Sequence, residues 1–184
     1  MVDDSDLAYA REQLAEADKR LRFVEERIDT GTDESSLRGF ETFVNIPNII
    51  SDCQVIIETS TKSMFKMVGV EHPNKHQLEF EDDRVEGFLR EIPGDFKRKS
   101  ELPRALFLTK FWHQFYTESK YGVPSLNINP RDLFNIDDAI RASDDAEFIV
   151  GLADDLLQAV GGRGIHEELD MELDEFVSVD DEEG

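Results

Sequence analysis

The stretch IPNIISDCQVIIETSTKSMFKMVG, residues 46–69, decides the fold of this 184-residue chain. Apolar side chains recur along it every three or four residues, which is the spacing of an amphipathic α-helix. The pattern reaches back to residue 36, and a single helix over 36–68 would be about 50 Å long at 1.5 Å per residue. Because proline lacks the amide hydrogen that a helix interior needs, Pro47 predicts a break into a short helix and a longer one. Gly69 is predicted to end the longer helix.

One further helix is predicted on each side of this stretch. Residues 5–30 carry an apolar stripe, with Ser5 as the expected N-cap and Gly31 as the expected stop. So long a stripe requires a partner helix alongside. A shorter helix is predicted over 82–91. The stripe of the first helix comprises Leu7, Ala10, Leu14, Ala17, Leu21, Val24 and Ile28.

The last two predicted helices cover 103–121 and 136–160. Pro103 is a favoured first helical residue, and Asn135 followed by Asp138 predicts a capping box. The first of these helices is expected to present an aromatic core face made by Phe107, Leu108, Phe111, Trp112 and Phe115. The second is expected to bury Ala139, Ala142, Ala146, Ile149, Ala153, Leu156 and Val160.

These segments predict an all-α protein, an up-and-down bundle of four to five helices over residues 5–160. No stretch shows the alternation of a strand. Residues 161–184 begin with GGRG, end with DDEEG and are predicted to form an acidic, flexible C-terminal tail. Ile165, Leu169, Leu173 and Phe176 share one helical face, so a docking helix in this tail is the alternative.

The composition indicates a soluble, cytoplasmic protein. The net charge is -22, there is more arginine than lysine, and the acidic excess lies in 1–35 and 135–184. Such a surface resembles that of proteins from salt-accumulating halophilic archaea. A single cysteine, Cys53, excludes an intrachain disulfide and favours a reducing compartment. The N-terminal residues do not resemble a signal peptide, and no apolar run is long enough to span a membrane.

Metal-ion, nucleophilic and phosphate-loop chemistry find little support. His72 and His76 have the i, i+4 spacing of helical zinc ligands, but Pro73 places His72 at the edge of a helix and further ligands are not at a recognisable spacing. No base lies next to Ser60 or Cys53, and the glycines after residue 160 lack the setting of a phosphate loop. We therefore expect no metal and no cofactor.

One segment, residues 96–121, has a positive balance in this acidic chain. On a continuous helix Lys110, His113, Thr117 and Lys120 would share the side away from the aromatic face. Such a stripe could bind phosphate or RNA, and His113 could move protons. An ordinary solvated face is the alternative. The candidate phosphate- or RNA-binding residues are Lys97, Arg98, Lys99, Lys110, His113 and Lys120.

A family resemblance rests on the central helix and the turn after it. Glu58 and Lys62 on the helix, followed by Gly69, Pro73 and His76, are similar to the central signature of HEPN domains. The segments FYTESKYG and DDAIRASDDAEFIVGLADDLLQAV resemble the later helices of that family. The similarity covers about residues 5–160.

The resemblance implies a helical bundle that forms homodimers. Many members are RNA-cleaving toxins, or pair with a nucleotidyltransferase-like protein in toxin-antitoxin or defence systems. The catalytic members use an arginine and a histidine separated by four to six residues, without a metal. None of the four histidines here has such an arginine. Lys66 and His72 have the length but not the residue, and Arg104 and His113, nine positions apart, could meet only across a dimer.

We therefore expect a non-catalytic HEPN-like module that binds a nucleotide or RNA and a partner protein. One alternative is a metal-independent ribonuclease toxin that uses His113 with a non-standard cation. The other is a purely structural interaction protein, whose binding would not change when Lys110 and Lys120 are replaced by glutamate.

Overall fold

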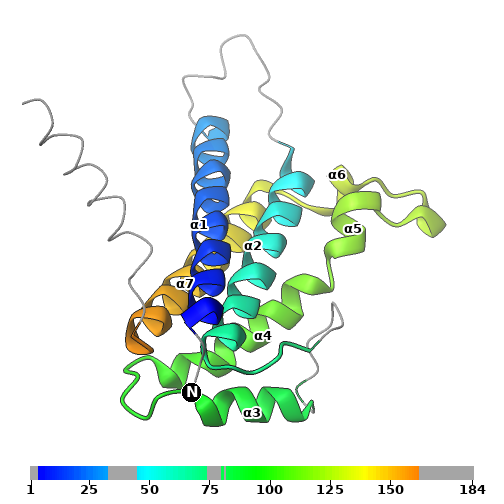
Figure 1. Cartoon of the computed structure of the whole chain (residues 1–184). Coiled ribbons are helices and arrows are strands. Elements are labelled where there is room, and N and C mark those ends of the chain that lie inside the picture. The colour runs from blue at the N-terminus through cyan, green and yellow to red at the C-terminus, as the bar shows by residue number, and fades with distance from the viewer. Residues whose placement is uncertain (1–3, 33–44, 74–79, 81, 162–184) are drawn as a thin grey trace, which may run out of the picture.

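The computed structural model describes residues 4–32, 45–73, 80 and 82–161, and this part of the chain is helical. An isolated antiparallel bridge between Val123 and Ile128 is its one β-type pairing. The all-α class is therefore confirmed for the described residues (Figure 1). The helices are α1 (Asp4–Thr32), α2 (Ile46–Met67), α3 (Asp83–Glu91), α4 (Leu102–His113), α5 (Tyr116–Tyr121), α6 (Pro130–Leu133) and α7 (Ile136–Ala159), with 3-10 turns η2 (Lys99–Glu101) and η3 (Pro124–Leu126).

The central helix of the protein is α2. It stands antiparallel beside α1, and α7 packs against both (Figure 1). Helices α4, α5 and α6 also contact α2. Because it has neighbours on several sides, α2 buries even polar residues such as Gln54, Ser60 and Thr61. None of the helices described combines the length and the apolar composition that crossing a membrane requires.

The predicted apolar stripes form the core. On α1 the stripe from Ala10 to Ile28 is buried and Leu7 packs against its edge. On α7 the predicted residues are buried, with Val160 half-buried at the end. The small residues Ala139, Ala142 and Ala146 are fully buried, as close helix packing requires.

Two predicted helix starts are confirmed. Pro47 occupies the first turn of α2, so the longer helix begins there, and the preceding short helix lies outside the described residues. The Asn135 side chain accepts hydrogen bonds from the amides of Asp137 and Asp138, and Asp138 in turn accepts from the Asn135 amide. This is the predicted capping box.

Several boundary predictions were wrong. The helix expected over 103–121 is two helices, since α4 ends at His113 and α5 begins at Tyr116. At the break the amides of Gln114 and Phe115 bond to carbonyls three residues back, which is the tighter 3-10 pattern. Helix α1 starts before Ser5 and runs past Gly31.

The aromatic face of α4 also differs from the prediction at one residue. Leu108 and Trp112 are buried and Phe111 and Phe115 pack against the core, but Phe107 is 55% exposed. Its ring stacks on that of Phe111 at 6.2 Å and otherwise faces outward. Phe107 therefore belongs to the surface.

Candidate functional site

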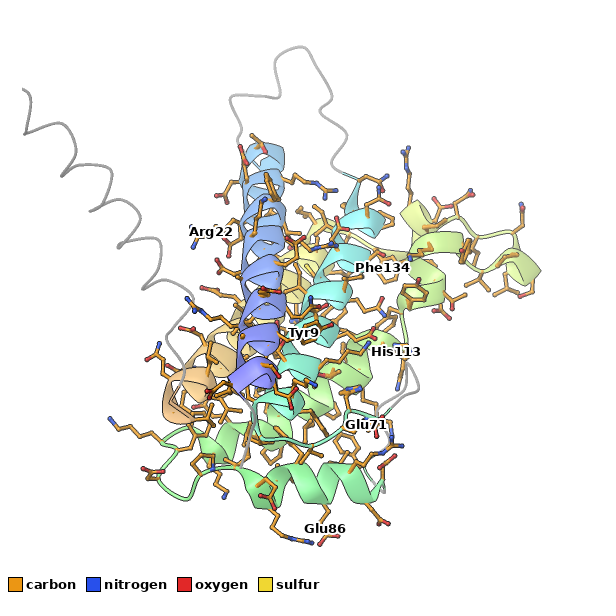
Figure 2. All side chains as sticks on the ribbon, in the orientation of Figure 1. Tyr9, Arg22, Glu71, Glu86, His113 and Phe134 are labelled. Atoms are coloured by element: carbon orange, nitrogen blue, oxygen red, sulfur yellow. The ribbon has the colours of Figure 1, made fainter. Side chains whose placement is uncertain are left out.

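A groove of about 630 Å³ lies over the C-terminal half of α2. Helix α1 forms one wall, α2 forms the floor, and the segment 69–73 that follows α2 forms the other wall. Figure 2 shows Tyr9 on α1 and Glu71 on that following segment. The lining residues are Asp6, Tyr9, Gln13, Thr59, Lys62, Ser63, Lys66, Gly69, Val70, Glu71, His72 and Pro73.

The second wall depends on the turn at Gly69. The amide of Gly69 donates to the carbonyl of Lys66, and that of Val70 donates to the carbonyl of Phe65, both at 3.0 Å. This pair of bonds is the Schellman motif, which requires a left-handed residue, and Gly69 has φ +72°. The prediction that Gly69 ends the helix is confirmed. The reversed chain then returns to the groove as its wall.

The groove holds two lysines whose ion pairs are partly open to solvent. Lys66 contacts Asp6 at 2.7 Å, and Lys62 contacts Glu58 at 2.5 Å. The lysine side chains are 44% and 48% exposed, and pairs at such positions contribute about 1 kcal/mol or less. An incoming anion can therefore replace these carboxylates at low cost.

An aromatic ring stands beside these lysines. Tyr9 is 54% exposed, and the Lys66 ammonium lies 5.9 Å from the centre of its ring. A tyrosine ring presented at the rim of a polar groove can stack on a planar ligand.

His72 lines the groove, and one of its ring nitrogens is buried. Its Nδ1 lies 2.8 Å from the carbonyl oxygen of Pro73, so Nδ1 carries the proton and donates. Nε2 is then a bare acceptor, and it is buried without a hydrogen-bond partner among the described residues. The ring packs edge-on against Phe65 at 5.0 Å. Burial lowers the pKa of His72, against the opposing effect of the Pro73 bond, and this favours the neutral imidazole.

The predicted basic residues near the start of α4 are engaged within the protein. Arg98 donates to Glu101 and, at 2.6 Å, to Asp155 on α7, and these bonds raise the pKa of the guanidinium. Lys99 donates to the carbonyl of Ile92. Lys97 is exposed. Of the three, Arg98 joins η2 to α7 and is a structural residue.

The other predicted residues lie near the end of α4 and on α5. The Lys110 ammonium lies 5.1 Å from the ring centre of Phe80, and that of Lys120 lies 2.5 Å from the Tyr116 hydroxyl. His113 is labelled in Figure 2, and its Nδ1 lies 3.4 Å from the side-chain amide nitrogen of Gln54.

The residues of the predicted stripe lie on two helices, with Lys110 and His113 on α4 and Lys120 on α5. The break after His113 also removes the straight helix on which Lys120 was placed by its spacing. Lys120 instead lines a separate hollow of about 480 Å³ with Arg131 and the start of α2.

The residues that carry the HEPN resemblance predicted the position of the groove better than the residues of the basic segment did. Lys62, Gly69 and Pro73 line it, and Glu58 contacts Lys62. His76 lies outside the described residues, and the predicted pairing of His72 with His76 therefore does too. In the described ranges no three His, Cys, Asp or Glu side chains are grouped closely enough to hold a metal.

Sequence reasoning missed the place of Tyr9 in the groove and the tautomer of His72. The available signal for Tyr9 was its place next to the buried Ala10, which turns a large aromatic side chain out of the apolar stripe. Comparison with known proteins adds no assignment, since no family model, no curated protein and no solved structure matches the chain.

Proposed function

We propose that the chain is a HEPN-like, non-catalytic binding module of a toxin-antitoxin or defence system, cytoplasmic and homodimeric, whose helices make an up-and-down bundle of the HEPN type. Its ligand is a nucleotide held in the groove between α1, α2 and residues 69–73. Its partner is a nucleotidyltransferase-like protein. The groove carries the proposal, because it joins an exposed aromatic ring to two displaceable lysine pairs.

The chemistry of the groove suits a mononucleotide. Lysine ammonium groups bind phosphate as point charges, a tyrosine ring stacks on a base, and the hydroxyl of Thr59 on the floor suits a ribose. Small-ligand sites measure about 300–1,000 Å³, and the groove falls in this range.

The residues of α4 support an RNA-binding surface less well. Arg98 and Lys99 already have protein partners, and they lie far along the chain from Lys110 and His113. Arg104, the arginine considered as a partner of His113, contacts Asp145 at 3.6 Å on another helix. A nucleotide in the groove is therefore favoured over RNA along α4 and over the ribonuclease alternative.

A protein partner is supported by exposed apolar residues around α5 and η3. Tyr121 and Leu126 are 67% and 68% exposed, and Tyr116 is partly exposed beside them in the chain. These elements lie to the side of the α1–α2 pair in Figure 1, where a second protein has access to them. Exposed aromatic and aliphatic residues of this kind are enriched in protein interfaces.

The test is calorimetric titration of the protein with AMP, CMP, GMP and UMP in molar and in low KCl. We expect binding that weakens at least about tenfold when Lys62 or Lys66 is changed to Glu, since a charged hydrogen bond contributes about 1.5–3 kcal/mol. Lys19→Glu, an exposed lysine on α1 outside the groove, is the control with the same charge change and should bind normally.

Two results would overturn the proposal. One is the absence of binding by all four nucleotides at both salt concentrations. The other is cleavage of added RNA that is lost in His113→Ala, which would establish the ribonuclease alternative. Binding of RNA that is lost in Lys110→Glu and Lys120→Glu, with the groove variants unaffected, would move the site to the basic segment.

A further inference from the structure

We propose that the groove selects guanine nucleotides, and that the carboxylate of Asp6 is the group that recognises the base. This inference rests on the proposed nucleotide function and adds the chemistry that distinguishes one base from another. It is carried by three groups that meet in the groove, namely the Asp6 carboxylate, the Lys66 ammonium and the Tyr9 ring.

These three groups lie close together and are open to solvent. All three residues line the groove. Oδ1 of Asp6 lies 2.7 Å from the Lys66 ammonium, which in turn lies 5.9 Å from the centre of the Tyr9 ring. The side chains of Asp6 and Lys66 are 35% and 44% exposed, and Tyr9 is 54% exposed. A ligand in the groove can therefore reach the ring, the carboxylate and the ammonium.

Helix α1 places the carboxylate beside the aromatic ring. Asp6 and Tyr9 are three residues apart and Gln13 follows four residues later, so their side chains share one face of the helix. That face is the α1 wall of the groove. A base stacked on Tyr9 consequently has a carboxylate next to its edge.

The Asp6–Lys66 pair presents a hydrogen-bond pattern that matches guanine. An ionised carboxylate has two acceptor oxygens, and an ammonium group is only a donor. The Watson–Crick edge of guanine carries the O6 acceptor, then the N1–H donor, then the 2-amino donor. Lys66 would donate to O6, and the two oxygens of Asp6 would accept from the two N–H donors.

The other three bases match this pair less well. Adenine and cytosine offer one amino group next to a ring nitrogen that accepts, and this nitrogen would face the second carboxylate oxygen. Uracil offers one N–H group between two carbonyl oxygens. Among the four bases only guanine gives a carboxylate two adjacent donors, and hydrogen bonds to an ionised group are roughly twice as strong as neutral ones.

Lys62 then remains for the phosphate. It lies one helical turn before Lys66 on α2 and lines the same groove. Its ion pair with Glu58 is partly exposed, so a phosphate can take the place of that carboxylate at low cost. One nucleotide would thus span the two lysines, with its base at Tyr9 and Lys66 and its phosphate at Lys62.

The experiment compares nucleotides that differ in one group, by calorimetric titration of the full chain in molar KCl. GMP is compared with IMP, whose base lacks only the 2-amino group, and with AMP. We expect GMP to bind about tenfold more tightly than IMP, a difference of about 1.4 kcal/mol. AMP should bind more weakly than GMP by at least the same factor. This comparison uses the unaltered protein and does not depend on how any variant folds.

Asp6→Asn tests the carboxylate. The substitution keeps the size of the side chain but replaces one acceptor oxygen by a donor. The preference for GMP over IMP should therefore fall from about tenfold to no more than about twofold. Asp4→Asn makes the same charge change at an exposed residue of α1 outside the groove, and it should keep the preference. Urea unfolding of both variants checks their fold.

Tyr9→Ala tests the stacking of the base. Stacking is available to every base, so GMP, IMP and AMP should all bind about fivefold more weakly or worse. Phe23→Ala is the matched control, because it removes an aromatic ring of α1 that is 56% exposed and lies outside the groove. Equal affinities in these two variants would overturn the placement of the base on Tyr9.

The outcomes separate this inference from the function on which it rests. Equal binding of GMP and IMP, with binding still lost in Lys62→Glu, overturns the guanine selection and leaves nucleotide binding in place. A preference for GMP that survives in Asp6→Asn also overturns the role of Asp6, because another group must then recognise the base. Failure of AMP, CMP, GMP and UMP to bind overturns both proposals.

Discussion

The contact between α3 and α2 gives a quantitative test of the fold. Phe88 on α3 is fully buried and its ring stacks on that of Phe65 on α2, with the centroids 4.2 Å apart and the planes 11° from parallel. Replacing a buried phenylalanine by alanine costs about 3–5 kcal/mol. Out of a total stability of about 5–15 kcal/mol, Phe88→Ala should remove a large part.

The matched control is Phe107→Ala. This phenylalanine also lies on a helix but is 55% exposed, so its replacement should change the stability by no more than about 0.5 kcal/mol. Urea is the suitable denaturant because it leaves the ionic strength unchanged. For an m-value of about 2 kcal/mol per M, Phe88→Ala should lower the midpoint by about 2 M and Phe107→Ala by less than about 0.3 M. Equal shifts in the two variants would refute the placement of both rings.

Three further predictions concern single residues. Burial and the nearby Glu147 raise the pKa of Glu25. Its ionised form thus opposes folding, and Glu25→Gln should stabilise the protein by a few tenths of a kcal/mol at pH 7, a gain that disappears below about pH 4 in urea titrations. Gly122 has φ +67°, and an added Cβ would lie 2.2 Å from a backbone oxygen, so Gly122→Ala should lower the thermal midpoint clearly while Gly87→Ala, in an open helical position, should raise it slightly. Burial raises the pKa of the Cys53 thiol to about 12, and labelling by a thiol reagent at pH 8 should therefore follow unfolding; rapid labelling of the folded protein would contradict its burial.

The long helices could be predicted because each carries a complete local signal. The stripe of α1, the capping box of α7 and the Pro47 and Gly69 limits of α2 are properties of neighbouring residues. Periodicity and capping act within one or two turns, so a sequence contains all the information needed to place them.

The break between α4 and α5 had no such signal. Neither glycine nor proline stands at Gln114 or Phe115. The ring of Phe115 contacts those of Phe111 and Trp112 on α4. It also contacts the ring of Phe134, which follows α6, at 6.1 Å between centroids. A cluster that joins distant aromatic residues accounts for the turn of the chain, and such tertiary contacts override helical propensity. The predicted basic stripe required a straight helix, and the break divides its residues between α4 and α5.

The groove could be only partly predicted, because its walls come from three separate segments. Lys62 and Gly69 attracted notice through the family signature, but the position of Tyr9 depends on how α1 packs beside α2. The tautomer of His72 depends on the bond to Pro73, which exists only once the Schellman turn has reversed the chain. Proximity of this kind is a property of the fold and not of the spacing along the sequence.

The polar run in the middle of α2 links the core to the groove. Residues of this polar run lie on two sides of the helix. Thr61 lies in the core, where its hydroxyl is 2.7 Å from that of Thr109 on α4, whereas Thr59 and Ser63 line the groove. Because the Thr109 hydroxyl donates to its own helix at Ala105, the proton between the two threonines must come from Thr61. The helix is thus fixed against α4 by a directional bond on one side while it presents Thr59 and two lysines on the other. A rigid floor is what a site needs if its hydrogen-bonding groups are to select one ligand over another.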